Sequence, residues 1–177
     1  AQNFSAEEQH QIDSLNQVIA NPNIADTSLA GSYVALSEIL AASSLDTVIH
    51  LCEKAKTTAE KALKGSPTVQ TKKSLITHLA NALNNIGYVY DQQGDIPKAL
   101  VYYHKSLKIQ EEIGNKNGIA SNLNNIGLIY KNQGDIPKAL EYYHKSLNIQ
   151  EENGDKEGIA LSLNNIGFIY KRQGDLP

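Results

Sequence analysis

The sequence contains no methionine, no tryptophan and only one cysteine among its 177 residues. One thiol can form neither an intramolecular disulfide nor a cysteine-rich metal site, so both are excluded, and the cysteine count leaves the compartment undecided. The longest apolar stretch, residues 28–45, is broken by Ser, Gly and Glu38. Because about 20 consecutive apolar residues are needed to cross a bilayer, we expect no membrane segment in this piece.

An excess of charge of one sign is also lacking. The 16 Lys and Arg residues are balanced by 19 Asp and Glu residues, which gives a net charge of −3, and no basic block occurs. Binding to a phosphate backbone requires a dense positive field. The composition therefore indicates an ordinary globular chain and excludes nucleic acid as an expected partner.

Because the sequence contains no methionine, we expect that Ala1 is not a natural translation start. Two explanations stay open. Ala1-Gln2 is the end left by a signal peptidase, which cuts after small residues, or a domain has been excised for expression. The first explanation favours a periplasmic or extracytoplasmic location over a cytoplasmic one.

The dominant feature of the sequence is an internal repeat. Shifting the chain by 40 residues superimposes 83–122 on 123–162 with 29 identities, and 163–177 begins a third copy. Ten of the 12 glycines and three of the five prolines recur at this period. A period of this length is the signature of a repeat architecture.

Each copy is predicted to form two helices. Residues 119–133 contain no proline and place apolar residues at helical spacing. Gly134 then ends the first helix, Asp135 caps the next one, and Pro137 lies in its first turn, where a missing N–H is tolerated. The second helix is predicted over 136–152, so the unit is an antiparallel helix pair.

The region before the repeats is also predicted to be helical, with less regular sequence signals. Ser5 and Glu8 have the form of a capping box, which predicts a short amphipathic helix within 1–24. Residues 25–66 are predicted to form a divergent helix pair. Residues 67–177 are predicted to form the 40-residue repeats, the last of them truncated.

The repeated residues resemble the tetratricopeptide repeat pattern, in which Trp, Leu, Gly and Tyr on one helix are followed by Ala and Phe on the next. Leu83 and Leu123 stand where the Trp would be, Tyr103 and Tyr143 replace the Phe, and Glu replaces the closing Pro. The structural positions of the pattern are Gly87, Tyr90, Ala99, Gly127, Tyr130, Ala139 and Gly167.

This resemblance implies an all-α fold, a right-handed α-solenoid of antiparallel helix pairs that stack because one pair alone cannot bury enough apolar area. The 40-residue period resembles a subclass found in kinesin light chains, cell-polarity adaptors and bacterial peptide receptors and sensors. It implies a non-catalytic scaffold that binds a protein or an extended peptide. We expect the sensing or adaptor region of a larger bacterial signalling protein.

One face of each first helix is predicted to line the concave groove of this solenoid. At about 100° per residue, asparagines lie opposite the packed stripe of Leu83, Ile86, Gly87 and Tyr90. An Asn side chain can donate to and accept from one peptide unit, and in the resembling families asparagines of the first helix hold an extended peptide in this way. The expected groove residues are Asn85, Tyr88, Asn125, Leu128, Lys131, Asn165, Phe168, Lys171 and Arg172.

A second interpretation of the asparagines stays open. Asn85 and its equivalents could bond to neighbouring backbone or water and merely tolerate solvent. The adjacent Asn84, Asn124 and Asn164 repeat as faithfully although they are expected to point sideways. Repetition alone therefore does not demonstrate binding.

Catalysis, a cofactor and a metal are not expected. His104 and His144 recur, but equivalent residues of stacked repeats lie about 8–10 Å apart, too far to share one Zn²⁺. They are predicted to be surface or packing residues. Glu151-Glu152 is expected to be solvated charge without a partner. The sequence contains no metalloprotease, serine hydrolase or Cys-His signature.

Self-association is the alternative function. The residues Gly174-Asp175-Leu176-Pro177 stand where the second helix of the third copy should start. Ile166 and Tyr170, on the first helix of that copy, would therefore have no partner helix to pack against. Since solenoids need polar caps, we expect this end to pack against another copy, giving a homo-oligomer, or the natural chain to continue.

Overall fold

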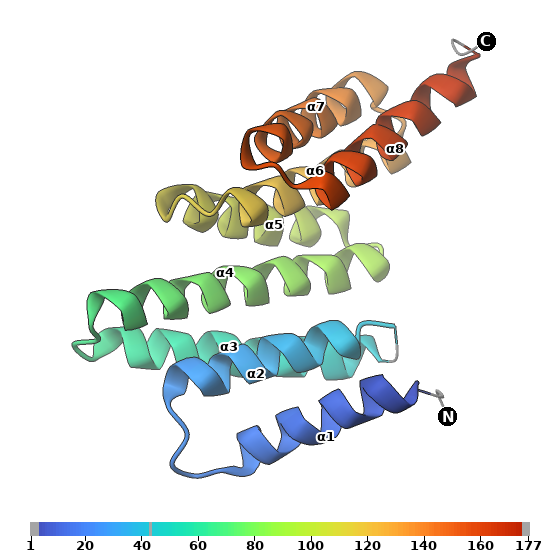
Figure 1. Cartoon of the computed structure of the whole chain (residues 1–177). Helices are drawn as coiled ribbons and strands as arrows, with labels where there is room; N and C mark the ends of the chain where they lie inside the picture. The colour runs from blue at the N-terminus through green and yellow to red at the C-terminus, as the bar shows by residue number, and fades with distance from the viewer. Residues whose placement is uncertain (1–3, 43, 175–177) are drawn as a thin grey trace. The chain divides into compact units, whose positions relative to one another are not determined.

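The computed structural model consists of eight α-helices, without strands, over the residues that it describes, 4–42 and 44–174 (Figure 1). The helices are α1 (Ala6–Ala20), α2 (Asp26–Ile39), α3 (Leu45–Lys64), α4 (Val69–Gln92), α5 (Ile96–Glu112), α6 (Lys116–Gln133), α7 (Ile136–Asn153) and α8 (Lys156–Gln173). The predicted all-α class of antiparallel helix pairs is confirmed. The helices predicted over 119–133 and 136–152 are α6 and α7.

Local sequence signals set the helix ends of the repeat. Gly134 adopts a φ of 82°, a left-handed conformation that a residue without a Cβ reaches at little cost. The Asp135 side chain then accepts a hydrogen bond from the backbone N–H of Lys138 at 3.3 Å, and a proline follows in the first turn. Near the start of the chain, Ser5 and Glu8 form the predicted capping box of α1.

The chain divides into two compact units, Ala1–Tyr102 and Tyr103–Pro177, and α5 contributes to both. In the first unit, α2, α3 and α4 pack on one another and α1 packs on α2. Its core contains Val34, Val48, Cys52, Ala55 and Ile86, all nearly inaccessible to solvent. The predicted segments 1–24, 25–66 and 67–177 remain a prediction.

In the second unit, α7 packs against both α6 and α8. The close approach of α6 and α7 depends on Gly127, because a Cβ at this position would lie 2.9 Å from two ring carbons of the fully buried Tyr143. The equivalent Gly167 on α8 has no atom of another described helix within 4 Å of the place that a Cβ would take.

The tyrosines of the pattern stack on tyrosines of the following helix. Tyr90 stacks on Tyr102 with ring centres 5.4 Å apart, and Tyr130 stacks on Tyr142 at 5.5 Å. Ala99 and Ala139 are fully buried in the same hairpins. Aromatic stacking therefore joins the two helices of a pair near their turn.

No helix among the described residues combines the length and apolar character that a bilayer span requires. The predicted processed end at Ala1-Gln2 and the residues 175–177 of the third copy lie outside the described part.

Candidate functional site

A cleft lies between α6 and α8 of the second unit. Its volume is about 710 Å³, and its walls come from the end of α6, the α6–α7 turn and the second half of α8. It is lined by Lys131, Asn132, Gln133, Ile136, Phe168 and Arg172, among others. Three of these, Lys131, Phe168 and Arg172, belong to the predicted groove, so the structure brings them together.

Two cations lie over one aromatic ring in this cleft. Lys131 Nζ is 5.3 Å and Arg172 Cζ is 5.8 Å from the centre of the Phe168 ring. The ring is 47% exposed, and at such exposed sites each contact contributes about 0.5–1 kcal/mol. Lys171 is also exposed, and none of the described lining residues is acidic. The cleft therefore presents positive charge beside an apolar surface.

Polar and apolar side chains extend this surface along α6 and α8. Asn165 is half-exposed, and its side chain makes no hydrogen bond within the described chain. Asn125 is also half-exposed and has a partner inside the protein. Leu128 is half-buried, whereas Asn132 and Leu161 are exposed. Leu161, Asn165, Phe168 and Arg172 recur at i, i+4, i+7 and i+11, which places them on one helical face.

The predicted groove residues of the first unit have a different environment. The Asn85 side-chain amide donates to Ser37 Oγ at 3.1 Å and to Glu38 Oε1 at 3.5 Å. Partial burial raises the pKa of Glu38, and the hydrogen bond from Asn85 opposes that rise. Tyr88 is half-buried on α4. Asn85 thus donates to two side chains of α2.

The neighbouring asparagine of the second unit, Asn124, was expected to point sideways, and it reaches the helices beside α6. Its side chain is buried and donates to Ser146 Oγ at 2.8 Å and to Ser162 Oγ at 3.1 Å. Gln150 accepts a further bond from the Ser162 hydroxyl at 2.7 Å. This network joins α6, α7 and α8. Asn164, the equivalent of Asn124 on α8, is exposed. A packing role is therefore shown for Asn124.

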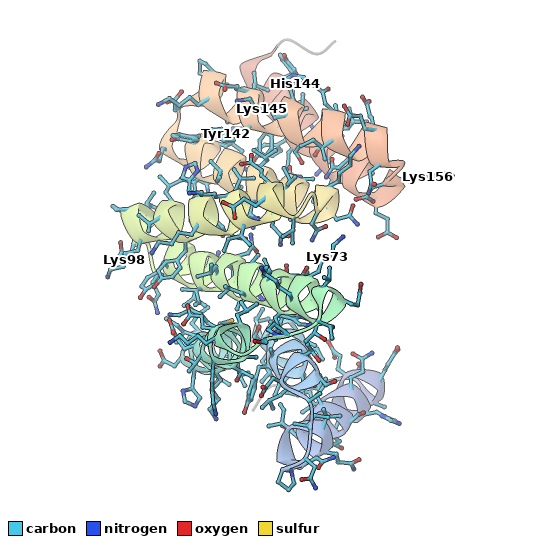
Figure 2. The ribbon with its side chains drawn as sticks, turned by 90° about the vertical axis from the view of Figure 1, so that its left-hand side faces the viewer. Lys73, Lys98, Tyr142, His144, Lys145 and Lys156 are labelled. Atoms are coloured by element: carbon cyan, nitrogen blue, oxygen red, sulfur yellow. The ribbon has the colours of Figure 1, made fainter. Side chains whose placement is uncertain are left out.

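The remaining candidates lie outside the cleft. His104 and His144 are exposed, and Figure 2 shows His144 with Lys145 on the outer side of α7. No group of His, Cys, Asp or Glu in the described ranges could hold a metal. Glu152 was predicted to have no partner, and this was wrong, because Lys116 lies 3.0 Å from its carboxylate. The pair is exposed, so it contributes little to stability.

Comparison with known proteins decides the family. A sequence model described as tetratricopeptide repeat matches residues 78–152 and 118–177. The chain belongs to the tetratricopeptide repeat family. Membership indicates a protein-interaction scaffold, and proteins of this family typically act without catalysis.

One solved structure supports the same all-α solenoid fold. The structure of BtubC (BKLC) from P. vanneervenii is 20% identical and superimposes with a TM-score of 0.59, over 96% of this chain and 68% of that one. MamA is also 20% identical, over 87% of this chain and 98% of its own, with a TM-score of 0.39. A search of curated proteins gave no match.

Proposed function

We propose that this tetratricopeptide repeat chain is a peptide-binding scaffold whose second unit holds an extended, acidic and partly apolar segment between α6 and α8. We propose further that it acts as the sensing or adaptor region of a larger bacterial signalling protein and is not an enzyme. The first proposal rests on the cleft, and the second on the subclass that the 40-residue period resembles.

The observation that carries the binding proposal is the pair of cations over Phe168. Lys131 and Arg172 come from different helices, yet both end at one exposed ring. A carboxylate of a bound segment could accept hydrogen bonds from both, and an apolar side chain could cover the ring. Asn165 would then face the peptide backbone with its donor and acceptor available.

The magnitudes explain why several groups are needed. Hydrogen bonds from asparagine side chains to a peptide backbone contribute a net ~0.5–1.5 kcal/mol each. A few such bonds give only millimolar affinity, even before the free-energy cost of association is subtracted. Hydrogen bonds to charged groups contribute about 1.5–3 kcal/mol each where they are shielded from water, and about 1 kcal/mol or less where they are exposed. The cations and the aromatic ring would therefore decide both affinity and charge preference.

Fluorescence anisotropy tests the proposal with two short labelled peptides, one alternating Leu with Glu and the other Leu with Lys. The Leu-Glu peptide should bind and the Leu-Lys peptide should not. Lys131→Ala with Arg172→Ala should weaken binding by about 10- to 30-fold, since each exposed cation contributes about 1 kcal/mol. Asn125→Ala with Asn165→Ala should also reduce binding while the helicity stays intact.

Lys138→Ala provides the matched control. Lys138 is an exposed lysine that also lies over an aromatic ring, 5.0 Å from the centre of Tyr130, but it does not line the cleft. This variant should bind as the parent protein does. Equal affinity for both peptides, or equal losses in the cleft and control variants, would contradict the proposal.

One observation favours self-association as a second candidate function. Leu163 is 51% exposed on α8, and Asn164 and Gly167 beside it lack the neighbours that their equivalents on α6 have. A second copy could cover this face. Analytical sedimentation of the parent and of Leu163→Glu tests the idea. An oligomer that dissociates in the variant supports it, and a monomer at high concentration for both proteins contradicts it.

A further inference from the structure

One face of α8 repeats the residues of a buried face of α6. The two helices are identical at four equivalent positions, which recur at i, i+3, i+4 and i+7 and so lie on one side of a helix. On α6 all four are buried, as Ala120, Leu123, Asn124 and Gly127. On α8 three are exposed and the last is half-buried, as Ala160, Leu163, Asn164 and Gly167. These four residues, here called the α8 face, thus have the composition of a helix interface but lack a covering helix among the described residues.

Helix α7 shows what such a face binds. The ring of Tyr143 lies on Gly127, where a Cβ would be 2.9 Å from two ring carbons. Ser146, three residues later, donates to the backbone carbonyl of Ala120 at 2.9 Å and accepts from the Asn124 side chain at 2.8 Å. One tyrosine and one serine of the covering helix therefore fill the glycine surface and satisfy the polar groups beside it.

An ion pair indicates the charge that a covering helix needs. Glu152, near the end of α7, lies 3.0 Å from Lys116 at the start of α6. Lys156 is the equivalent of Lys116, and it is exposed at the start of α8 without an ion pair to any described residue (Figure 2). An antiparallel covering helix with a carboxylate nine residues after its tyrosine, as in α7, would place that carboxylate beside Lys156.

The helices of this chain that carry the required residues are already in use. The sequence of α5 differs from 136–152 at two positions only. In both helices the tyrosine and the serine are buried, as Tyr103, Ser106, Tyr143 and Ser146. No other tyrosine of the sequence is followed by a serine three residues later. A folded second copy would have to release one of these helices to cover the α8 face in the same way, which favours a helix of another protein.

We propose that the α8 face binds an amphipathic helix of a partner protein in which a tyrosine is followed by serine at i+3 and glutamate at i+9. The tyrosine ring lies on Gly167. The serine hydroxyl donates to the Ala160 carbonyl and accepts from the Asn164 side chain. Leu163 packs against apolar side chains of the partner helix, and the glutamate pairs with Lys156.

This site is separate from the cleft proposed for an extended peptide. At about 100° per residue, the centre of the α8 face lies roughly 120° around the helix from the stripe that contains Phe168 and Arg172. Binding of a helix here therefore does not require a ligand in the cleft. A second copy of the chain would instead compete with the helix, because it would cover the same face.

A labelled synthetic peptide with the sequence of residues 134–154 is the probe, because it contains α7 with both of its capping residues. Fluorescence anisotropy with the full chain should show saturable binding. Tyr143→Ala in the peptide should weaken binding at least about tenfold, and Ser146→Ala should weaken it several-fold. His144→Ala, a change at an exposed position of α7, should leave the affinity of the peptide unchanged.

Gly167→Ala in the chain is the most informative variant. Its added Cβ has no described atom within 4 Å, so the chain should keep its fold. The same Cβ would meet the tyrosine ring of a bound helix, so the peptide should bind at least about tenfold more weakly. The Leu-Glu peptide should still bind this variant, which separates a failure of the α8 face from a failure of the cleft.

Two leucines of α8 provide a matched pair of substitutions. Leu163 on the α8 face is 51% exposed, and Leu161 on another side of the helix is 53% exposed. Leu163→Glu should weaken binding of the helical peptide, whereas Leu161→Glu should bind it as the parent chain does.

Three results would overturn the proposal. The first is that the peptide of residues 134–154 does not bind saturably. The second is that it binds the parent chain and Gly167→Ala equally well. The third is sedimentation of the chain alone as an oligomer that Leu163→Glu dissociates, because a second copy would then cover the α8 face.

Discussion

Substituting the two equivalent glycines Gly127 and Gly167 by alanine should change stability in opposite directions. The residues occupy the same place in successive repeats, yet among the described residues a neighbouring helix lies close to Gly127 and none lies close to Gly167. At Gly127 a Cβ would lie 2.9 Å from Cδ1 and Cε1 of Tyr143 and 3.3 Å from Cβ of Tyr142. Tyr143 is fully buried, so its ring has no free space to enter.

The magnitudes follow from two opposing effects. Alanine is favoured over glycine in a helix interior by about 0.8–1 kcal/mol, and this gain applies to both positions. Overpacking a tight interface costs about 1–3 kcal/mol, and this applies only to Gly127→Ala. We therefore expect Gly127→Ala to lower the free energy of unfolding by up to ~2 kcal/mol and Gly167→Ala to raise it by up to ~1 kcal/mol.

Urea unfolding followed by circular dichroism measures this difference. The midpoint should move to lower urea for Gly127→Ala and to higher urea for Gly167→Ala, at an unchanged slope. Equal shifts in the two variants would refute the reasoning, because they would mean that α7 does not pack closely on α6 at Gly127, or that the corresponding face of α8 is covered in solution.

Two further predictions concern buried groups. Burial raises the pKa of Cys52 to about 11. The thiol should therefore not react with Ellman's reagent at about pH 8 in the folded protein, and it should react fully in concentrated guanidinium chloride. Fast reaction of the native chain would contradict the burial of Cys52. Asn124→Ala should lower the free energy of unfolding by about 1–3 kcal/mol, because it removes a partner of Ser146 and Ser162. The exposed equivalent Asn164→Ala should change it by less than ~0.5 kcal/mol, and similar losses in both variants would show that the network does not stabilise the repeat.

Much of the fold follows from local signals in the sequence. Gly134, Asp135 and Pro137 each act within a few residues of the helix end that they define, so their meaning does not depend on the rest of the chain. The same holds for the capping box of α1. The stacking of Tyr130 on Tyr142 was not anticipated, because it depends on how the two helices rotate against each other.

Part of the candidate site also follows from helical geometry. The angle of 100° per residue placed Lys131, Phe168 and Arg172 on one surface, and the structure brings them to one cleft. Ile136 was missed because it is the first residue of α7, and the expected groove was built from first helices alone. The bond between Asn85 and Ser37 was missed because it joins residues 48 apart outside the repeated lattice.

NMR mapping of a bound peptide tests the central claim most directly. The Leu-Glu peptide is added to the isotope-labelled chain, and the backbone amide shifts are compared with the positions of the cleft residues. The account predicts the largest changes around Lys131 to Ile136 and from Asn165 to Arg172, with small changes on the outer face of α7. Changes centred on His144 and Lys145, or spread evenly along the chain, would contradict it.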